Sequence, residues 1–217
     1  MPLIDLTQPF SDGMFSLKVF PRVTVERCVR LEERGLNVTR VEFAVHAGTH
    51  IDSPRHFFAD GRSIDEITLE EVSGAAVGLR VDRGPGEEIT VDDLEANRPG
   101  VERGDLVFIS TGWAHHFYGD QRRYAIHPYL SVAAAEWLAD RGARMVAMDV
   151  PTPDQPEPGR PPGFDWPVHH MLLGRGILVA EHLANLDAVA GLRFRAFAFP
   201  LPIRGSDGSP ARIVAEI

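Results

Sequence analysis

The sequence has little of several features that mark common classes of protein. Its 217 residues include one cysteine, Cys28, which excludes an intrachain disulfide and favours a reducing cytoplasm. The net charge of −9 argues against non-specific binding to nucleic acid or to an anionic membrane. No apolar run approaches the roughly 20 residues that span a bilayer, and the first residues lack the pattern of a signal peptide. We therefore expect a cytoplasmic protein without nucleic-acid or membrane partners.

Several catalytic signatures are missing as well. The sequence contains no G-x-S-x-G elbow, no P-loop and no G-x-G-x-x-G, which argues against a serine hydrolase and against nucleotide binding. It also lacks repeats and low-complexity tracts, and 44% of its residues are hydrophobic. This composition predicts one globular domain over residues 1–217 with a substantial core.

Strand-like and helix-like segments alternate along the chain, which indicates an α/β fold. Strands are expected over 40–46, 76–83, 105–110, 143–150, 176–180 and 194–201. In the first of these, the alternation predicts one apolar face made of Val41, Phe43 and Val45. Helices are expected over 90–97 and 131–142. Thr90 and Ser131 are suitable N-cap residues for them.

A proline-rich segment separates the strand over 143–150 from the last part of the chain. Residues 150–167 contain seven prolines and two glycines, so they cannot form a regular element. A linker between domains is one interpretation, but the strands that follow need partners from the preceding part of the chain. We therefore expect a long ordered loop, of the kind that often lines a site.

The stretch HAGTHIDSPRH, residues 46–56, is unusually rich in possible metal ligands: His46, His50, Asp52 and His56. Gly48 and Pro54 argue against a helix here, so we expect a tight turn followed by an irregular or extended piece. In an extended piece, the i, i+2 spacing of His50 and Asp52 places both side chains on one face. Two imidazoles and a carboxylate form a common part of a Zn²⁺ or Mn²⁺ site.

A second group of candidates lies far along the chain, in HHMLLGRGILVAEH: His169, His170, Glu181 and His182. Metal sites often draw a ligand from a distant element, so this group is a natural source of further ligands. The alternative is that His169 and His170 cap a short helix or face solvent. The spacing alone does not decide between these interpretations.

HAGTHIDSPRH resembles the H-x-G-T-H-x-D-x-P-x-H signature of the metal-dependent cyclase-like hydrolase family, which includes kynurenine formamidase-like and isatin hydrolase-like enzymes. The match is complete at every fixed position, and the resemblance extends over nearly the whole chain, through residues 60–67, 127–154, 169–181 and 208–215. It implies a swivelling β/β/α fold and arylformamidase-like chemistry on C–N bonds other than peptide bonds. It also implies a homodimer or homotetramer in which neighbouring subunits contribute to the site.

The resemblance further implies roles for individual residues. His46, His50 and Asp52 would hold a first divalent ion, Zn or Mn. His169 and Glu181 would complete the position of a second ion, if two are bound. Asp52 would be able to bridge from the first ion to the second. His56, the last residue of the signature, would be the catalytic acid/base. This role suits an imidazole, whose ordinary pKa near 6.5 lets it accept and return a proton close to neutral pH.

Aromatic side chains are candidates for the substrate pocket. Phe10, Phe15 and Phe20 lie in one segment near the N-terminus, and Trp113 follows the strand over 105–110. If they line the pocket, they favour a flat apolar or aromatic group beside the carbonyl; otherwise they belong to the core, a subunit interface or a surface loop. We therefore expect a hydrolase of a small aryl formamide or cyclic amide. The alternatives are a metal-dependent lyase or cyclase and a metal-binding protein without catalysis.

Overall fold

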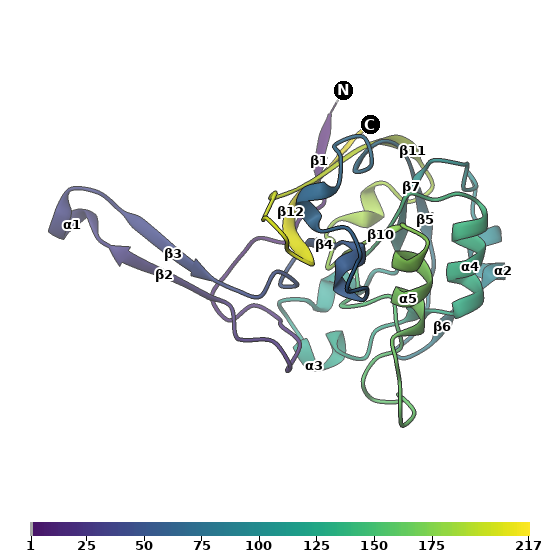
Figure 1. The fold of residues 1–217 in the computed structure, drawn as a ribbon, viewed down its shortest axis with the longest axis horizontal. Helices are drawn as coiled ribbons and strands as arrows, with labels where there is room; N and C mark the ends of the chain where they lie inside the picture. Colours follow the sequence, from purple (N-terminus) through teal and green to yellow (C-terminus); the bar gives the residue numbers. More distant parts are fainter. Residues whose placement is uncertain (1) are drawn as a thin grey trace.

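A closed barrel of strands forms the centre of the molecule (Figure 1). The structure is a computed structural model, and it describes residues 2–217. The main sheet consists, in spatial order, of β1 (Leu3–Asp5), β12 (Gly208–Glu216), β11 (Arg193–Pro200), β5 (Ser73–Arg80), β7 (Leu106–Ser110), β9 (Met145–Met148), β10 (Leu178–Glu181) and β4 (His50–Asp52). Because β4 also pairs with β12, the seven strands from β12 to β4 close on themselves, and β1 extends the sheet outside this ring.

Strands β5, β7, β9 and β10 run parallel to one another, and the other pairs of the main sheet are antiparallel. Parallel neighbours need crossover connections, and these connections contain helices. The crossovers hold α2 (Val91–Glu95), α4 (Val132–Asp140) and α5 (Pro167–Gly174), and α4 and α5 lie side by side against the barrel (Figure 1). The remaining elements are α3 (Gln121–Tyr124), the pair β6 (Glu88–Ile89) and β8 (Tyr129–Leu130), and the 3₁₀ turns Pro54–His56, Ile64–Glu66, Trp113–His116 and Leu186–Ala188.

Both faces of the parallel strands are buried, which explains their nearly continuous apolar sequences. In β7, Leu106 and Phe108 belong to the core inside the barrel. Val107 and Ile109, which point the other way, belong to the core shared with α4 and α5. The expected α/β class is therefore confirmed.

Most of the elements expected from the sequence are present. Strands β5, β7, β9, β10 and β11 occupy five of the six predicted segments, and α2 and α4 occupy the two predicted helices. The Thr90 side chain accepts a hydrogen bond from the backbone N–H of Asp93, and the Ser131 side chain accepts one from the N–H of Ala134. The proline-rich loop runs from β9 to the start of α5 at Pro167, as expected.

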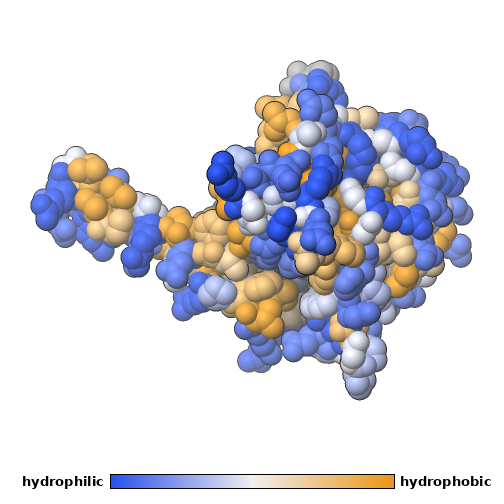
Figure 2. Space-filling view, viewed as in Figure 1, coloured by the Kyte–Doolittle hydropathy of each residue, from blue (hydrophilic) through white to orange (hydrophobic). Residues whose placement is uncertain are grey.

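The predicted strand over 40–46 is wrong in its extent and in its burial. Strand β3 covers Val38–Glu42 and pairs with β2 (Thr24–Val29) in a projecting arm, with α1 (Leu31–Arg34) at its tip (Figure 1). All residues of β3 are exposed, and apolar side chains of the arm are visible at its surface (Figure 2). The alternation of Val41 with its neighbours is real, but a two-stranded ribbon has no second layer to cover it.

Across residues 2–217, no helix is both long enough and apolar enough to cross a membrane.

Candidate metal centre

Strands β4 and β10 bring polar side chains together in the wall of the barrel. His50 and Asp52 are two residues apart on β4, so they share a face, while Ile51 points into the barrel core. Strand β10 runs antiparallel beside β4 and places Glu181 directly opposite His50. All three polar residues are buried, so the register of these two strands sets an imidazole and two carboxylates at one spot away from water.

His169 reaches the same spot from the first turn of α5. Asp154 accepts hydrogen bonds from the backbone N–H groups of Val168 (2.9 Å) and His169 (3.0 Å), and it lies 2.6 Å from Nδ1 of His169. His50 is held in a similar way, because its Nδ1 donates to the carbonyl of Gly48 at 2.8 Å, where the backbone has a φ of +63°. With both Nδ1 atoms engaged, the Nε2 atoms of His50 and His169 are turned toward the carboxylates as potential ligands.

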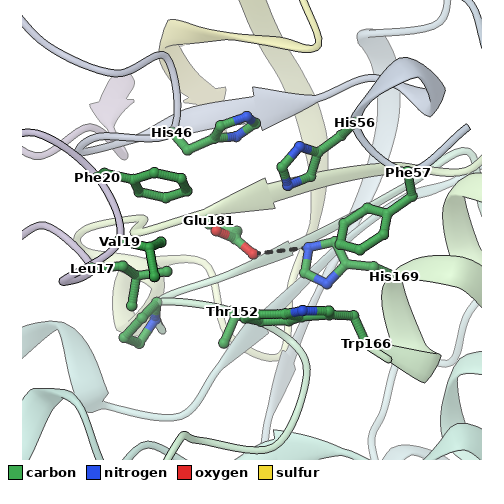
Figure 3. A pocket seen from close by; sticks show the side chains of 11 residues that line it. Leu17, Val19, Phe20, His46, His56, Phe57, Thr152, Trp166, His169 and Glu181 are labelled. Atoms are coloured by element: carbon green, nitrogen blue, oxygen red, sulfur yellow. Dashed lines mark ion pairs between the residues drawn. The ribbon is translucent and has the colours of Figure 1, made fainter. Parts of the chain in front are cut away.

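The distances between these groups suit a shared cation. Nε2 of His50 lies 3.2 Å from Asp52 and 3.3 Å from Glu181. Nε2 of His169 lies 3.3 Å from Asp52 and 3.2 Å from Glu181, the latter contact drawn as a dashed line in Figure 3. Two ligand atoms bound to one ion at about 2.0–2.2 Å lie roughly 3.0–3.6 Å apart in tetrahedral or octahedral geometry. The nitrogen and oxygen donors therefore fit a divalent ion such as Zn²⁺ or Mn²⁺.

Unpaired polar atoms support the same conclusion. Among residues 2–217, the buried atoms Nε2 of His50 and Oε1 of Glu181 have no hydrogen-bond partner, although charged groups lie near them. Buried polar atoms normally have a partner, so such orphaned atoms call for a ligand.

The charges of the cluster are strongly coupled. Burial opposes a charge on His50, but the carboxylates of Asp52 and Glu181 outweigh it and raise the pKa of His50 to about 10. Burial and the Asp52 carboxylate act against ionisation of Glu181, yet His169 and His50 lower the pKa of Glu181 to about 2. The two carboxylates are thus held as anions that attract positive charge, and a divalent cation supplies this charge in place of protons.

His46 and His56 lie at the mouth of the cluster with Asp207 between them. Nδ1 of His46 is 2.7 Å from Asp52, and its Nε2 is 2.6 Å from Asp207. Nδ1 of His56 is 3.3 Å from the same oxygen of Asp207. Gly208 makes this close approach possible, because a Cβ there would lie 2.9 Å from Cε1 of His46. Burial lowers the pKa of His56, which keeps it neutral and able to accept a proton near pH 7.

A pocket of about 250 Å³ opens beside this cluster (Figure 3). It is lined by Leu17, Val19, Phe20, His46, His56, Phe57, Pro151, Thr152, Trp166, His169 and Glu181. In Figure 3, Leu17, Val19 and Phe20 lie on one side, and Phe57 and Trp166 lie on the other. Apolar walls with a few convergent polar groups are typical of a small-molecule site.

The structure brings together all six residues that the sequence associated with metal binding and catalysis. Among residues 2–217, three sets of side chains are close enough to hold an ion: His46, Asp52 and His56; His50, Glu181 and His182; and Asp52, His169 and Glu181. Asp52 and Glu181 each belong to two of these sets, as bridging ligands would. His170 is exposed and lies outside all three sets, with its Nδ1 near the carbonyl of Trp166. The division of ligands between one or two ions stays a prediction.

The four aromatic candidates have different positions. Phe20 lines the pocket beside the histidines, and Phe15 lines a neighbouring pocket. Phe10 packs against Phe43, and Trp113 is buried, with its Nε1 donating to the carbonyl of Tyr124. Within residues 2–217, neither Phe10 nor Trp113 lines the pocket that holds the histidines.

Sequence reasoning missed Asp154 and Asp207. Asp154 ends the segment VPTPD in the proline-rich loop, and its only signal was its place in the loop that follows a buried strand. Asp207 has no local signal, because it reaches the site through the pairing of β12 with β4, in which Gly208 lies opposite Asp52. Contacts of this kind depend on the barrel closing.

Comparisons with known proteins agree with this geometry. Residues 4–155 match the family described as "Putative cyclase". A kynurenine formamidase from Bacillus cereus is 31% identical over 213 residues, which cover 97% of this chain and 95% of the relative. Isatin hydrolase A from Ralstonia solanacearum has a TM-score of 0.86 at 26% identity, covering 99% of this chain and 91% of that one. A protein from Bacillus stearothermophilus described as a "predicted metal-dependent hydrolase" has a TM-score of 0.75 at 26% identity, covering 99% of this chain and 97% of that one. The chain therefore belongs to the cyclase family of metal-dependent hydrolases.

Proposed function

We propose that this protein is a metal-dependent amidohydrolase that cleaves the C–N bond of an aryl formamide or a cyclic amide. One observation carries the proposal: the carboxylates of Asp52 and Glu181 lie 3.2–3.3 Å from the Nε2 atoms of His50 and His169, beside a pocket that also contains His56. The similarity to a kynurenine formamidase over 97% of the chain and to isatin hydrolase A in fold supports the same class of reaction.

The metal would be held by the four residues of the cluster, His50, Asp52, His169 and Glu181. His46 would be a further ligand. A divalent ion bound there would lower the pKa of a water molecule toward neutrality and polarise the carbonyl oxygen of the amide. We expect Zn or Mn as the native metal, in one or two positions. The buried carboxylates keep the ligand set anionic, and Asp154 keeps the His169 ring in its orientation.

His56 moves the protons. It lines the pocket at the mouth of the cluster, and its Nδ1 lies 3.3 Å from Asp207. A neutral His56 accepts a proton from the attacking water and then donates it to the leaving nitrogen, as a general acid/base. Asp207 stabilises the protonated ring between these two steps. The apolar walls of Phe57 and Trp166 suit a flat aromatic group next to the carbonyl.

The test is turnover of an aryl formamide and of isatin by the metal-loaded protein in isotopically labelled water. The proposal expects one labelled oxygen in the carboxylate that forms. The amine leaves as a separate product from the formamide and stays on the ring-opened product of isatin. Product without label would favour the lyase or cyclase alternative, in which the same His56 transfers protons without net hydrolysis. Metal binding with no turnover of any amide, lactam or ester would favour a metal-binding protein without catalysis.

We also propose that the protein is a homodimer or homotetramer. The arm of β2, α1 and β3 supports this, because it projects from the body and carries exposed apolar side chains: Leu31, Leu36, Val38 and Val41 (Figure 2). Light scattering of the native protein and of a variant with Leu36→Asp and Val41→Asp tests it, and a monomer at micromolar concentration would contradict it. The cytoplasmic location expected from the sequence stays a prediction.

A further inference from the structure

His182 is a buried imidazole that the proposed reaction does not use. It follows Glu181 directly at the end of β10, and it is only 1% exposed. Among the described residues, it is not part of the lining of the pocket beside the metal cluster, so a substrate in this pocket does not contact it. Even so, one potential ligand atom from each of His182, His50 and Glu181 lies within 4.8 Å of the other two. His182 therefore reaches the cluster from the interior of the protein.

The backbone at His182 has a strained conformation. Its φ is +58°, a left-handed value that costs a residue other than glycine about 1–3 kcal/mol. Two hydrogen bonds hold it: the N–H of His182 donates to the carbonyl of Val150 at 3.0 Å, and the hydroxyl of Thr49 donates to the carbonyl of His182 at 2.8 Å. Thr49 directly precedes His50, so the segment that carries the metal ligands also fixes His182. Strain that the surroundings hold in this way is common at functional sites.

Tyr124 fixes the ring of His182. Its hydroxyl oxygen lies 2.9 Å from Nδ1 of His182, and the two rings stack with an angle of 30° between their planes. The hydroxyl of Tyr124 also donates to the carbonyl of Asp149 at 3.4 Å, so its oxygen is able to accept the proton of Nδ1. Phe15 and Phe117 pack against the same ring, with centroid distances of 5.7 Å and 5.6 Å. The ring is thus held with Nδ1 as a donor, which leaves the lone pair of Nε2 free.

The two histidines of the cluster are held in the same way. His50 and His169 each engage Nδ1 with an oxygen of the protein and leave Nε2 for a metal. A hydrogen bond from the second ring nitrogen is the usual device that sets the tautomer and the orientation of a metal-binding histidine. In His182, the hydroxyl of Tyr124 takes the place of that oxygen. The other tautomer of His182 would turn an N–H toward a bound cation, which is unfavourable.

The two orphaned atoms of the cluster belong to the residues that form a set with His182. Nε2 of His50 and Oε1 of Glu181 are buried without a hydrogen-bond partner within residues 2–217. The ring of His182 lies 5.7 Å from that of His50, measured between centroids. Two ligand atoms at about 2.0–2.2 Å on opposite sides of one ion lie about 4.0–4.4 Å apart. The three side chains therefore need to move little to share an ion.

We propose that Nε2 of His182 is a further ligand of the ion that His50 and Glu181 bind, and that Tyr124 is the residue that positions it. His182 is then a sixth residue beside the five that the family resemblance assigns to the metal, and it binds from the side away from the pocket. This inference rests on the proposed metal-dependent function and deepens it, because it names the groups that hold the metal from the interior.

Proton magnetic resonance of the Co²⁺-loaded protein tests the proposal. The ring N–H of an imidazole bound to Co²⁺ gives a signal far outside the ordinary range, so these signals count the histidine ligands. His182→Asn should remove one such signal and keep the others, because asparagine tolerates the left-handed conformation. Competition with a chelator should show that its affinity for Co²⁺ falls by about 100-fold or more. Loss of a group that merely orients a ligand already costs about 10-fold to 100-fold.

Tyr124→Phe tests the positioning role. This variant keeps an aromatic ring against His182 but removes the acceptor of its Nδ1–H, so the shifted signal of His182 should move and should exchange faster in D₂O. The affinity for Co²⁺ should fall by about 10-fold to 100-fold. His127→Asn is the matched control, since His127 is also a buried imidazole but belongs to none of the three sets within residues 2–217. It should leave the number of shifted signals and the affinity unchanged.

Two results would overturn the inference. One is a set of shifted signals in His182→Asn that equals that of the native protein, whether or not the affinity falls, because His182 then acts only through packing. The other is an affinity of His182→Asn for Co²⁺ within twofold of the native value. If His182→Asn does not fold, Tyr124→Phe decides, because shifted signals identical to those of the native protein would likewise overturn the inference.

These measurements separate the inference from the proposed function, because none of them requires turnover. If the protein hydrolyses no amide but His182→Asn loses one shifted signal and its affinity for Co²⁺, the proposed function fails and the ligand stands. If the metal-loaded protein hydrolyses aryl formamides and His182→Asn keeps every shifted signal, the ligand fails and the proposed function stands.

Discussion

Replacing Asp154 by asparagine should weaken metal binding, although Asp154 is not itself a proposed ligand. Asp154 is fully buried and receives three contacts: the N–H groups of Val168 and His169 and the ring Nδ1 of His169. A carboxylate accepts all three, whereas an asparagine has one accepting oxygen and one donating NH₂ group. The NH₂ group must therefore face a donor on one of its two sides.

Each orientation of the amide has a cost. If the NH₂ group faces His169, the proton of the ring moves to Nε2, and this atom can no longer bind a metal. If the NH₂ group faces Val168, a buried N–H at the start of α5 loses its acceptor, which costs about 1–3 kcal/mol of folding free energy. Loss of a partner that orients a metal-binding histidine typically lowers metal affinity by about 10-fold to 100-fold, and we expect an effect of this size.

The assay is a competition between the protein and a chelator of known affinity, for native protein and Asp154→Asn. Asp105→Asn is the control, because Asp105 is equally buried but pairs with Arg193 away from the site. The control should lower the unfolding free energy and leave metal affinity unchanged. Metal affinity of Asp154→Asn within twofold of native protein would refute the positioning role.

Three further outcomes follow from the site and the core. His56→Ala should keep its metal and lose about 10²–10⁴-fold in turnover, and near-native steady-state rates would remove His56 from the mechanism. Asp207→Asn removes the anion beside His56, so the acidic limb of the pH–rate profile should move to lower pH; an unmoved limb would contradict this role. Burial lowers the pKa of His127 from 6.5 to about 4, so the unfolded chain takes up this proton first as the pH falls below 6.5. At about pH 5, this difference in proton uptake lowers the unfolding free energy of the native protein by about 2 kcal/mol. Between about pH 7.5 and 5, the unfolding free energy of His127→Gln should therefore fall by about 2 kcal/mol less than that of the native protein. Equal pH dependence in urea unfolding of the two proteins would argue against a buried neutral His127.

Local patterns predicted the elements that are buried on both faces or capped by their own residues. The apolar run of β7 and the capping residue of α2, Thr90, are examples, because the cause of each structure lies within a few residues. Strand β12 was not predicted, because Pro210 and two small residues interrupt its apolar pattern. It forms because β11, β1 and β4 pair with it. The same alternation of apolar residues that marks a core strand occurs in β3, where only the projecting arm explains its exposure.

The candidate site likewise combines residues that a local pattern identifies with residues that only the pairing of distant strands brings in. The dense signature around His50 and Asp52 was recognisable because its ligands are close in sequence. Glu181 joins them through the register of β10 against β4, and Asp207 through the closure of the barrel. Pairing of distant strands is a property of the whole fold, so no local pattern could have identified Asp207.

The most direct test of the account is the rate of formate release from an aryl formamide, measured against the amount of bound metal. Protein stripped with a chelator should show negligible turnover, and stepwise addition of Zn²⁺ or Mn²⁺ should restore the rate in proportion to the metal bound by the cluster around Asp52 and Glu181. Stripped protein that still hydrolyses the formamide at the rate of the loaded enzyme would contradict the central claim.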